Sequence, residues 1–76
     1  MNKQRRKSIG EVISKLEELR EELDGIMSDE QEAFDNLPES LQESDRGNAM
    51  QEAIDNLDYA MSSFEEAIEY LESASE

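Results

Sequence analysis

The sequence predicts an all-α fold in which two long helices form an antiparallel hairpin, and two such hairpins pair as a four-helix bundle. Hydrophobic residues recur with a heptad period in both halves of the chain, and its single proline lies between the halves. Only 36% of the 76 residues are hydrophobic and 37% are charged, so the core must be a narrow seam or be shared between subunits. We therefore expect a homodimer.

The first helix is predicted over residues 8–37. Ser8 and Glu11 have the spacing of a capping box, in which each side chain satisfies a free backbone N–H. Residues 1–7 are predicted to form a flexible basic arm, because cations are disfavoured at a helix N-terminus. The apolar stripe of this helix places Ile9, Leu16 and Leu23 at heptad position a, Val12, Leu19, Ile26 and Ala33 at d, and Ile13, Met27 and Phe34 at e.

Two residues interrupt this pattern. Gly25 could break the helix, but the stripe keeps its register across it, which favours one continuous helix over a chain folded back there into a compact monomer. Glu30 occupies an a position. Either the seam opens toward water at that point, or this carboxylate is buried at a partner interface.

Pro38 should end the first helix, because the residue before a proline resists the helical conformation. Residues 38–47 are predicted to form a connector, in which Pro38 could begin a short helical turn. The second helix is predicted over residues 46–74, with Ser44 or Asp45 as its cap. The domain of residues 8–76 would then be a single helical hairpin.

The second helix carries the clearest repeat in the chain. Large apolar side chains occupy its a and e positions and alanines its d positions, so a partner helix could approach toward the lower end of the usual range of about 8–10 Å. The residues that we assign to the core or dimer seam, from both helices, are Leu16, Leu19, Leu23, Ile26, Phe34, Ile54, Leu57, Ala60, Phe64, Ala67 and Leu71.

The composition argues against an enzyme. The chain has no histidine and no cysteine, which removes the usual nucleophile–base pairs and the nitrogen and sulfur ligands of zinc. We expect no catalytic residues, no metal and no cofactor. No apolar run is long enough to cross a bilayer and no secretory signal is present, so a cytoplasmic location is expected and membrane binding is not.

The net charge of −14 points to a basic protein partner. Four of the seven cations lie in residues 1–7, so only three accompany the 21 acidic residues of the remainder, which should repel nucleic acids directly. Acidic residues at positions b, c and f could imitate the charge of a nucleic acid, or could simply keep a small bundle soluble. The candidate partner-binding residues are Asp55, Asp58, Tyr59, Glu65, Glu66, Glu69 and Glu72.

Part of the sequence resembles a group of small, acidic, helical proteins encoded by phages and prophages of Gram-positive bacteria. The resemblance lies in Ala33-Phe34-Asp35-Asn36-Leu37-Pro38-Glu39-Ser40-Leu41-Gln42, followed by Ala53-Ile54-Asp55-Asn56-Leu57, together with the basic start and the acidic remainder. It implies an inhibitor or modulator of a host defence or transcription protein, such as a CRISPR effector or a restriction system, acting in the host cytoplasm. The alternative is a structural or assembly protein that uses its Ala/Leu seam to dimerise or to bind a partner helix.

Overall fold

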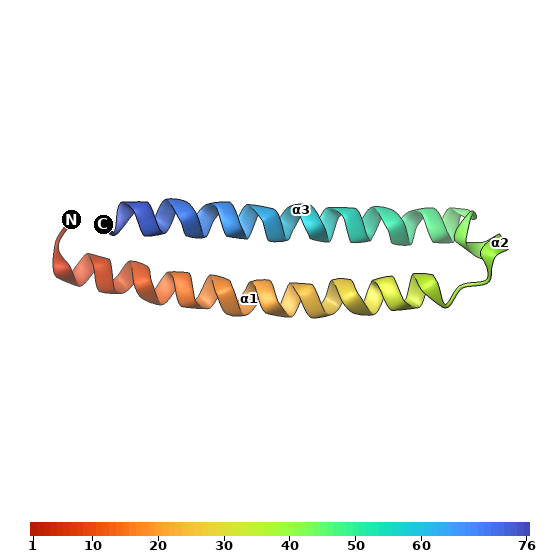
Figure 1. Cartoon of the computed structure of the whole chain (residues 1–76), viewed down its shortest axis with the longest axis horizontal. Helices are drawn as coiled ribbons and strands as arrows, with labels where there is room; N and C mark the ends of the chain where they lie inside the picture. The colour runs from red at the N-terminus through yellow and green to blue at the C-terminus, as the bar shows by residue number, and fades with distance from the viewer.

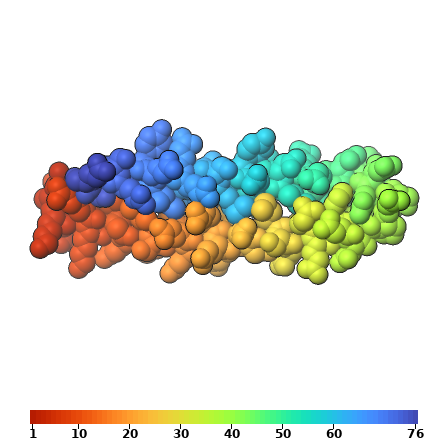
Figure 2. Space-filling view, in the orientation of Figure 1, coloured from red at the N-terminus to blue at the C-terminus, as the bar shows by residue number.

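The computed structural model describes residues 1–76 as three α-helices without strands: α1 (Lys3–Asp35), α2 (Glu39–Gln42) and α3 (Asp45–Ala74). The two long helices pack against each other, and α2 packs against α3. They run side by side in opposite directions, with both chain termini at one end of the molecule and α2 at the other (Figure 1). The molecule is a rod measuring 58 × 15 × 11 Å (Figure 2). The predicted all-α fold is confirmed.

Helix α1 begins five residues earlier than predicted. Asn2 is its cap, because the Asn2 side chain accepts a hydrogen bond of 2.8 Å from the backbone N–H of Arg5. Ser8 lies inside the helix, where its hydroxyl donates to the carbonyl oxygen of Gln4 at 3.1 Å. The predicted start at Ser8 is therefore wrong. An asparagine cap contributes about 1 kcal/mol, which offsets the unfavourable effect of solvated cations on the helix dipole.

Helix α1 is unbroken at Gly25, so the chain does not fold back there. It ends at Asp35, two residues earlier than predicted, and the N–H of Asn36 closes its last turn by donating to the carbonyl oxygen of Glu32 at 3.0 Å. Pro38 then precedes the short helix α2, in agreement with the predicted helical turn.

A close junction joins the connector to the start of α3. The Gln42 side-chain amide donates to the carbonyl oxygens of Phe34 at 3.2 Å and Leu37 at 3.1 Å, so it ties the connector to the end of α1. Ser44 caps α3, its hydroxyl oxygen accepting from the N–H of Gly47 at 3.4 Å. Gly47 is buried, and a Cβ atom at this position would lie 2.6 Å from the carbonyl oxygen of Leu41. The backbone of the connector therefore occupies the space that the side chain of any residue larger than glycine would need at position 47.

The contact between α1 and α3 is narrow. Ile54 and Ile68, both at position e of α3, are the only buried hydrophobic residues, each 7% exposed. Helix α1 contributes half-buried residues from its a and e positions, including Glu30, which lies at the edge of this contact. Its d positions are different: Leu19 is 47% and Ile26 54% exposed.

Leu19 and Ile26 therefore lie outside the contact between α1 and α3, whereas the other nine residues predicted for the core or dimer seam are buried or half-buried. The physical reason is the angle around the helix. Measured around the helix axis, position e lies about 40° to one side of position a, and position d lies about 60° to the other side. A contact centred between a and e therefore turns d away from the partner helix. Tyr59 and Tyr70 are also exposed.

Candidate protein-binding faces

Acidic residues of both long helices form one continuous face of the rod. Two adjacent shallow grooves between α1 and α3 share Arg20 and Glu65, so their linings join. Positions b and f of both helices supply the acidic residues of these grooves, because these two positions lie about 40° apart on a helix. We define the acidic face as Glu17, Glu21 and Asp24 of α1 with Asp58, Glu65, Glu69 and Glu72 of α3.

The acidic face carries a charge density close to that of a nucleic-acid strand. Arg20 contacts Glu65, so the three acidic residues of α1 lie level with the stretch of α3 between Asp58 and Glu72. That stretch rises about 21 Å along the rod, which gives about one carboxylate every 3 Å. One strand of duplex DNA has one charge per about 3.4 Å. The two rows of carboxylates on this face together therefore have a mean charge density along the rod close to that of one DNA strand.

Little in the chain neutralises this charge. The Arg20 guanidinium and the Glu65 carboxylate form the only salt bridge, with an N–O distance of 3.3 Å. Their side chains are 37% and 60% exposed, so water screens this pair strongly. The remaining carboxylates of the acidic face have no cation within salt-bridge distance and are solvated. The face is thus available to an external cationic group.

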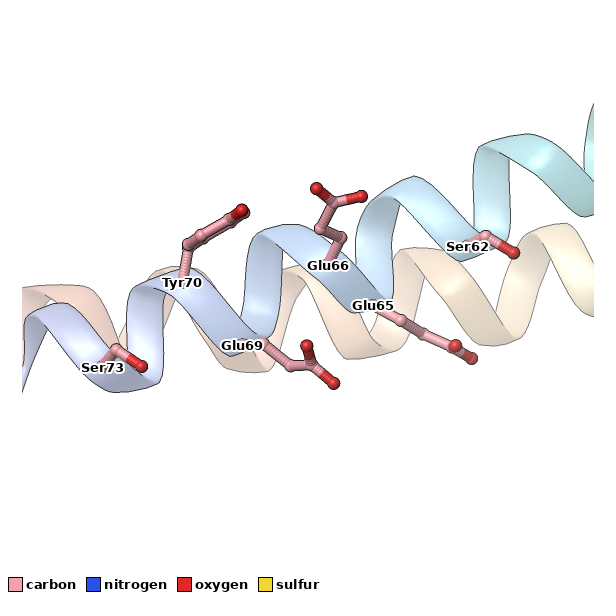
Figure 3. A pocket seen from close by; sticks show the side chains of 6 residues that line it. All are labelled: Ser62, Glu65, Glu66, Glu69, Tyr70 and Ser73. Carbon is pink, nitrogen blue, oxygen red and sulfur yellow. The ribbon is translucent and has the colours of Figure 1, made fainter.

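Four of the seven predicted partner-binding residues, Asp58, Glu65, Glu69 and Glu72, line the grooves of the acidic face. Glu66 lines neither groove, and in Figure 3 it points away from Glu65 and Glu69, beside Tyr70. Tyr59 and Asp55 are exposed but line neither groove. The hollow drawn in Figure 3 lies along a single helix and is open, so it does not enclose a ligand.

The seven candidate residues predicted from the sequence all lie on α3, so the three α1 residues of the acidic face are additions from the structure. Glu17, Glu21 and Asp24 had the right heptad positions, but which flanks of two helices share a face depends on how the helices pack. The signal that could have found them was the recurrence of acids at b and f in both helices.

The opposite side of the α1–α3 pair is apolar. A groove there is lined by Leu19, Leu23 and Ile26 of α1 and Phe64 of α3, with Glu22 at its edge. On α1, residues two positions apart lie about 160° apart around the helix, so Leu19 points away from the neighbouring acids of the acidic face. We define the apolar face as these four hydrophobic residues, the exposed Val12, and the alanines at position d of α3.

The chain holds no group of three or more potential ligand side chains arranged to bind a metal ion. No helix is both long and apolar enough to cross a membrane. Comparison with protein-family models, curated proteins and solved structures finds no match for this chain. The fold and the two faces define an all-α protein in which two long packed helices separate an acidic face from an apolar one.

Proposed function

We propose that this protein is a non-enzymatic binding module whose acidic face occupies the nucleic-acid-binding surface of a basic protein. The observation that carries the proposal is the mean charge density of the acidic face, close to one charge per 3.4 Å of a DNA strand, together with its single internal cation. Such a surface would compete with nucleic acid for the partner and would bind it less tightly as salt rises.

The resemblance to phage and prophage proteins supports a particular kind of partner. We propose a host defence or transcription protein, which the chain would inhibit or modulate in the host cytoplasm. Within the seven candidate residues, the grooves favour Asp58, Glu65, Glu69 and Glu72 as contacts and add Glu17, Glu21 and Asp24. Tyr59 and Glu66 would contact only a partner that also reached around α3.

The test is a capture experiment with two charge-matched variants. Tagged protein would be incubated with a lysate of a Gram-positive host and eluted in steps of rising salt, with the eluates identified by mass spectrometry. The first variant is Asp58→Lys, Glu65→Lys and Glu69→Lys, which reverses the centre of the acidic face. The control changes net charge equally at position c, away from this face, and is Glu11→Lys, Glu18→Lys and Glu52→Lys.

We expect wild type and the control to retain a nucleic-acid-binding protein that elutes at moderate salt, and the first variant to lose it. DNA or RNA added to the lysate should displace the same protein. Equal retention by both folded variants would refute the proposed face, because net charge rather than its arrangement would then govern binding. Circular dichroism of both variants would verify that they are folded.

A second function is favoured by the apolar face. We propose that the α1–α3 pair is a helical hairpin, and that two copies pack through this face as a homodimeric four-helix bundle. The exposed Leu19 and Ile26 support this proposal, because an apolar stripe along a helix normally faces a packing partner. The protein would then have an assembly role alongside, or instead of, binding a basic partner. Its test is the mass in solution, which should be twice 8.7 kDa.

A further inference from the structure

We infer that the two copies of this dimer are related by a two-fold axis parallel to the rod, so that α1 of each copy packs over α3 of the other. This inference rests on the proposed four-helix bundle and specifies its architecture. The apolar faces meet in the middle, both connectors lie at one end, and the two acidic faces point outward on opposite sides.

The surface area of the single chain supports a partner on the apolar face. The chain exposes 5714 Å², whereas a compact monomer of its mass, 8.7 kDa, exposes about 4,700 Å². The excess of about 1,000 Å² is close to the area of about 800 Å² that each partner buries in a standard interface. A rod 58 Å long and 15 Å wide offers a face of this size. A second copy would bring the surface of each chain back to the normal range.

The register of the helices supports the orientation. The contact of Arg20 with Glu65 shows which residues of α1 and α3 lie level, and a two-fold axis along the rod preserves these levels between copies. Leu19 of one copy then lies over Ala67 of the other. Because the helices run in opposite directions, one heptad further along α1 brings Ile26 over Ala60.

The same register holds along the whole apolar face. Val12 comes over Ala74, and Ala33 over Ala53, so every bulky d side chain of α1 meets an alanine of the partner's α3. Close packing favours such alternation of large and small residues across facing positions. This complementarity would occur twice in the dimer, once on each side of the axis.

Charge is compatible with this arrangement. The first turns of α1 carry Lys3, Arg5, Arg6 and Lys7, and in this dimer they lie near the last turns of the partner's α3. That end of α3 carries Glu72 and Glu76, and its exposed carbonyl groups give it a negative partial charge. The basic end of each α1 would therefore face an acidic helix end.

The competing arrangement has a two-fold axis perpendicular to the long axis of the rod. It stacks α1 of one copy on α1 of the other, with Leu19 facing Ile26. The alanines at position d of the two α3 helices then face each other. One side of the bundle would then hold two bulky columns and the other side two small ones. The two dimers consequently predict different pairs of neighbouring residues.

Cysteine cross-linking distinguishes these pairs, because the chain has no native cysteine. Single variants Leu19→Cys, Ala67→Cys and Ile26→Cys would be mixed in pairs, with an affinity tag on one member, and oxidised without denaturant. A disulfide needs Cα atoms within about 7 Å, whereas a shift of one heptad moves them about 10.5 Å apart. The control pairs Leu19→Cys with Ser62→Cys, which lies in a groove of the acidic face.

In the pair of Leu19→Cys and Ala67→Cys, we expect disulfides between a tagged and an untagged chain to form at least about tenfold faster than in the control pair. The reason is that a dimer raises the effective thiol concentration to about millimolar. The pair Val12→Cys and Ala74→Cys should behave in the same way, which provides a second test if Leu19→Cys impairs folding. Light scattering of the unmodified chain would establish its mass independently.

Three results would overturn the inference, and they are distinguishable. A mass of 8.7 kDa at about 100 μM chain, far above the dissociation constant of a stable dimer, would remove both the four-helix bundle and its architecture. A dimer that links Leu19→Cys preferentially to Ile26→Cys would retain the bundle but establish the axis across the rod. A dimer in which no apolar-face pair exceeds the control would place the interface elsewhere.

Discussion

Replacing Gly47 by alanine should destabilise the protein, whereas the same replacement at Gly10 or Gly25 should stabilise it. All three glycines lie inside helices, where alanine is favoured over glycine by about 1 kcal/mol. Their surroundings differ. A Cβ atom at Gly10 or Gly25 meets nothing within 4 Å, whereas at Gly47 it would lie 2.6 Å from the Leu41 carbonyl oxygen and still closer to that of Gln42.

The magnitude follows from how the connector is held. Ordinary contact with a Cβ atom begins near 3.4 Å, so the backbone at Leu41 and Gln42 must move away from α3. Such overpacking costs about 1–3 kcal/mol. Movement of Gln42 would also strain its hydrogen bonds to the carbonyl oxygens of Phe34 and Leu37, each contributing about 1 kcal/mol. After the gain in helix propensity, a net loss of about 1–3 kcal/mol remains.

Thermal unfolding followed by circular dichroism measures this difference. A change of 1 kcal/mol moves the melting temperature of a domain of this size by about 4–8 °C. We therefore expect Gly47→Ala to melt about 5–20 °C below wild type, and Gly25→Ala about 3–8 °C above it. All samples need the same chain concentration, because the stability of a self-associating protein depends on concentration. If Gly47→Ala were as stable as Gly25→Ala, the close packing of the connector on α3 would be wrong.

Three further predictions concern the contact between the helices. Ile68→Ala should lower the free energy of unfolding in urea by about 2–4 kcal/mol, because Ile68 is one of two buried hydrophobic residues. Tyr59→Ala, at an exposed position, should change it by less than about 0.5 kcal/mol. Equal effects of the two substitutions would contradict the observed burial. Arg20→Ala should lower stability by less than about 1 kcal/mol through loss of its salt bridge, since the Glu65 side chain is 60% exposed, and a larger loss in a urea titration would show that the half-buried Arg20 side chain also stabilises the contact by packing. Glu30→Leu should raise the melting temperature, because Glu30 is half-buried at an apolar heptad position, and an unchanged or lower value would mean that its carboxylate has a partner in solution.

Local patterns in the sequence predicted the helices and their approximate ends. The heptad period in both halves, preserved across Gly25, indicated the long helices that the structure contains. Pro38 marked their separation because its effect on the preceding residue is local. The start of α1 was predicted wrongly at Ser8, since both Ser8 and Asn2 can cap a helix and the choice between them depends on small energy differences.

The candidate faces were only partly predictable. Position in the heptad predicted that acids would gather on the flanks of each helix, and Asp58, Glu65, Glu69 and Glu72 do line one face. It indicated acidic stripes on both helices, but it did not predict which carboxylates of α1 would line the same grooves as those of α3, or that Leu19 and Ile26 would remain exposed in the single chain. Both depend on the angle at which each stripe meets the other helix, and a stripe three positions wide allows more than one angle.

The secondary structure, the acidic charge and the lack of histidine and cysteine chemistry could all be read from the sequence, because these properties reside in single residues or in neighbours along one helix. The tertiary packing selected which residues meet across the chain. It turned the a and e positions of α1 toward α3, left an apolar face opposite an acidic one, and made Gly47 the point of closest approach to the connector. The physical reason is that packing between helices depends on their relative rotation and register, which are set by all the contacts of the interface together.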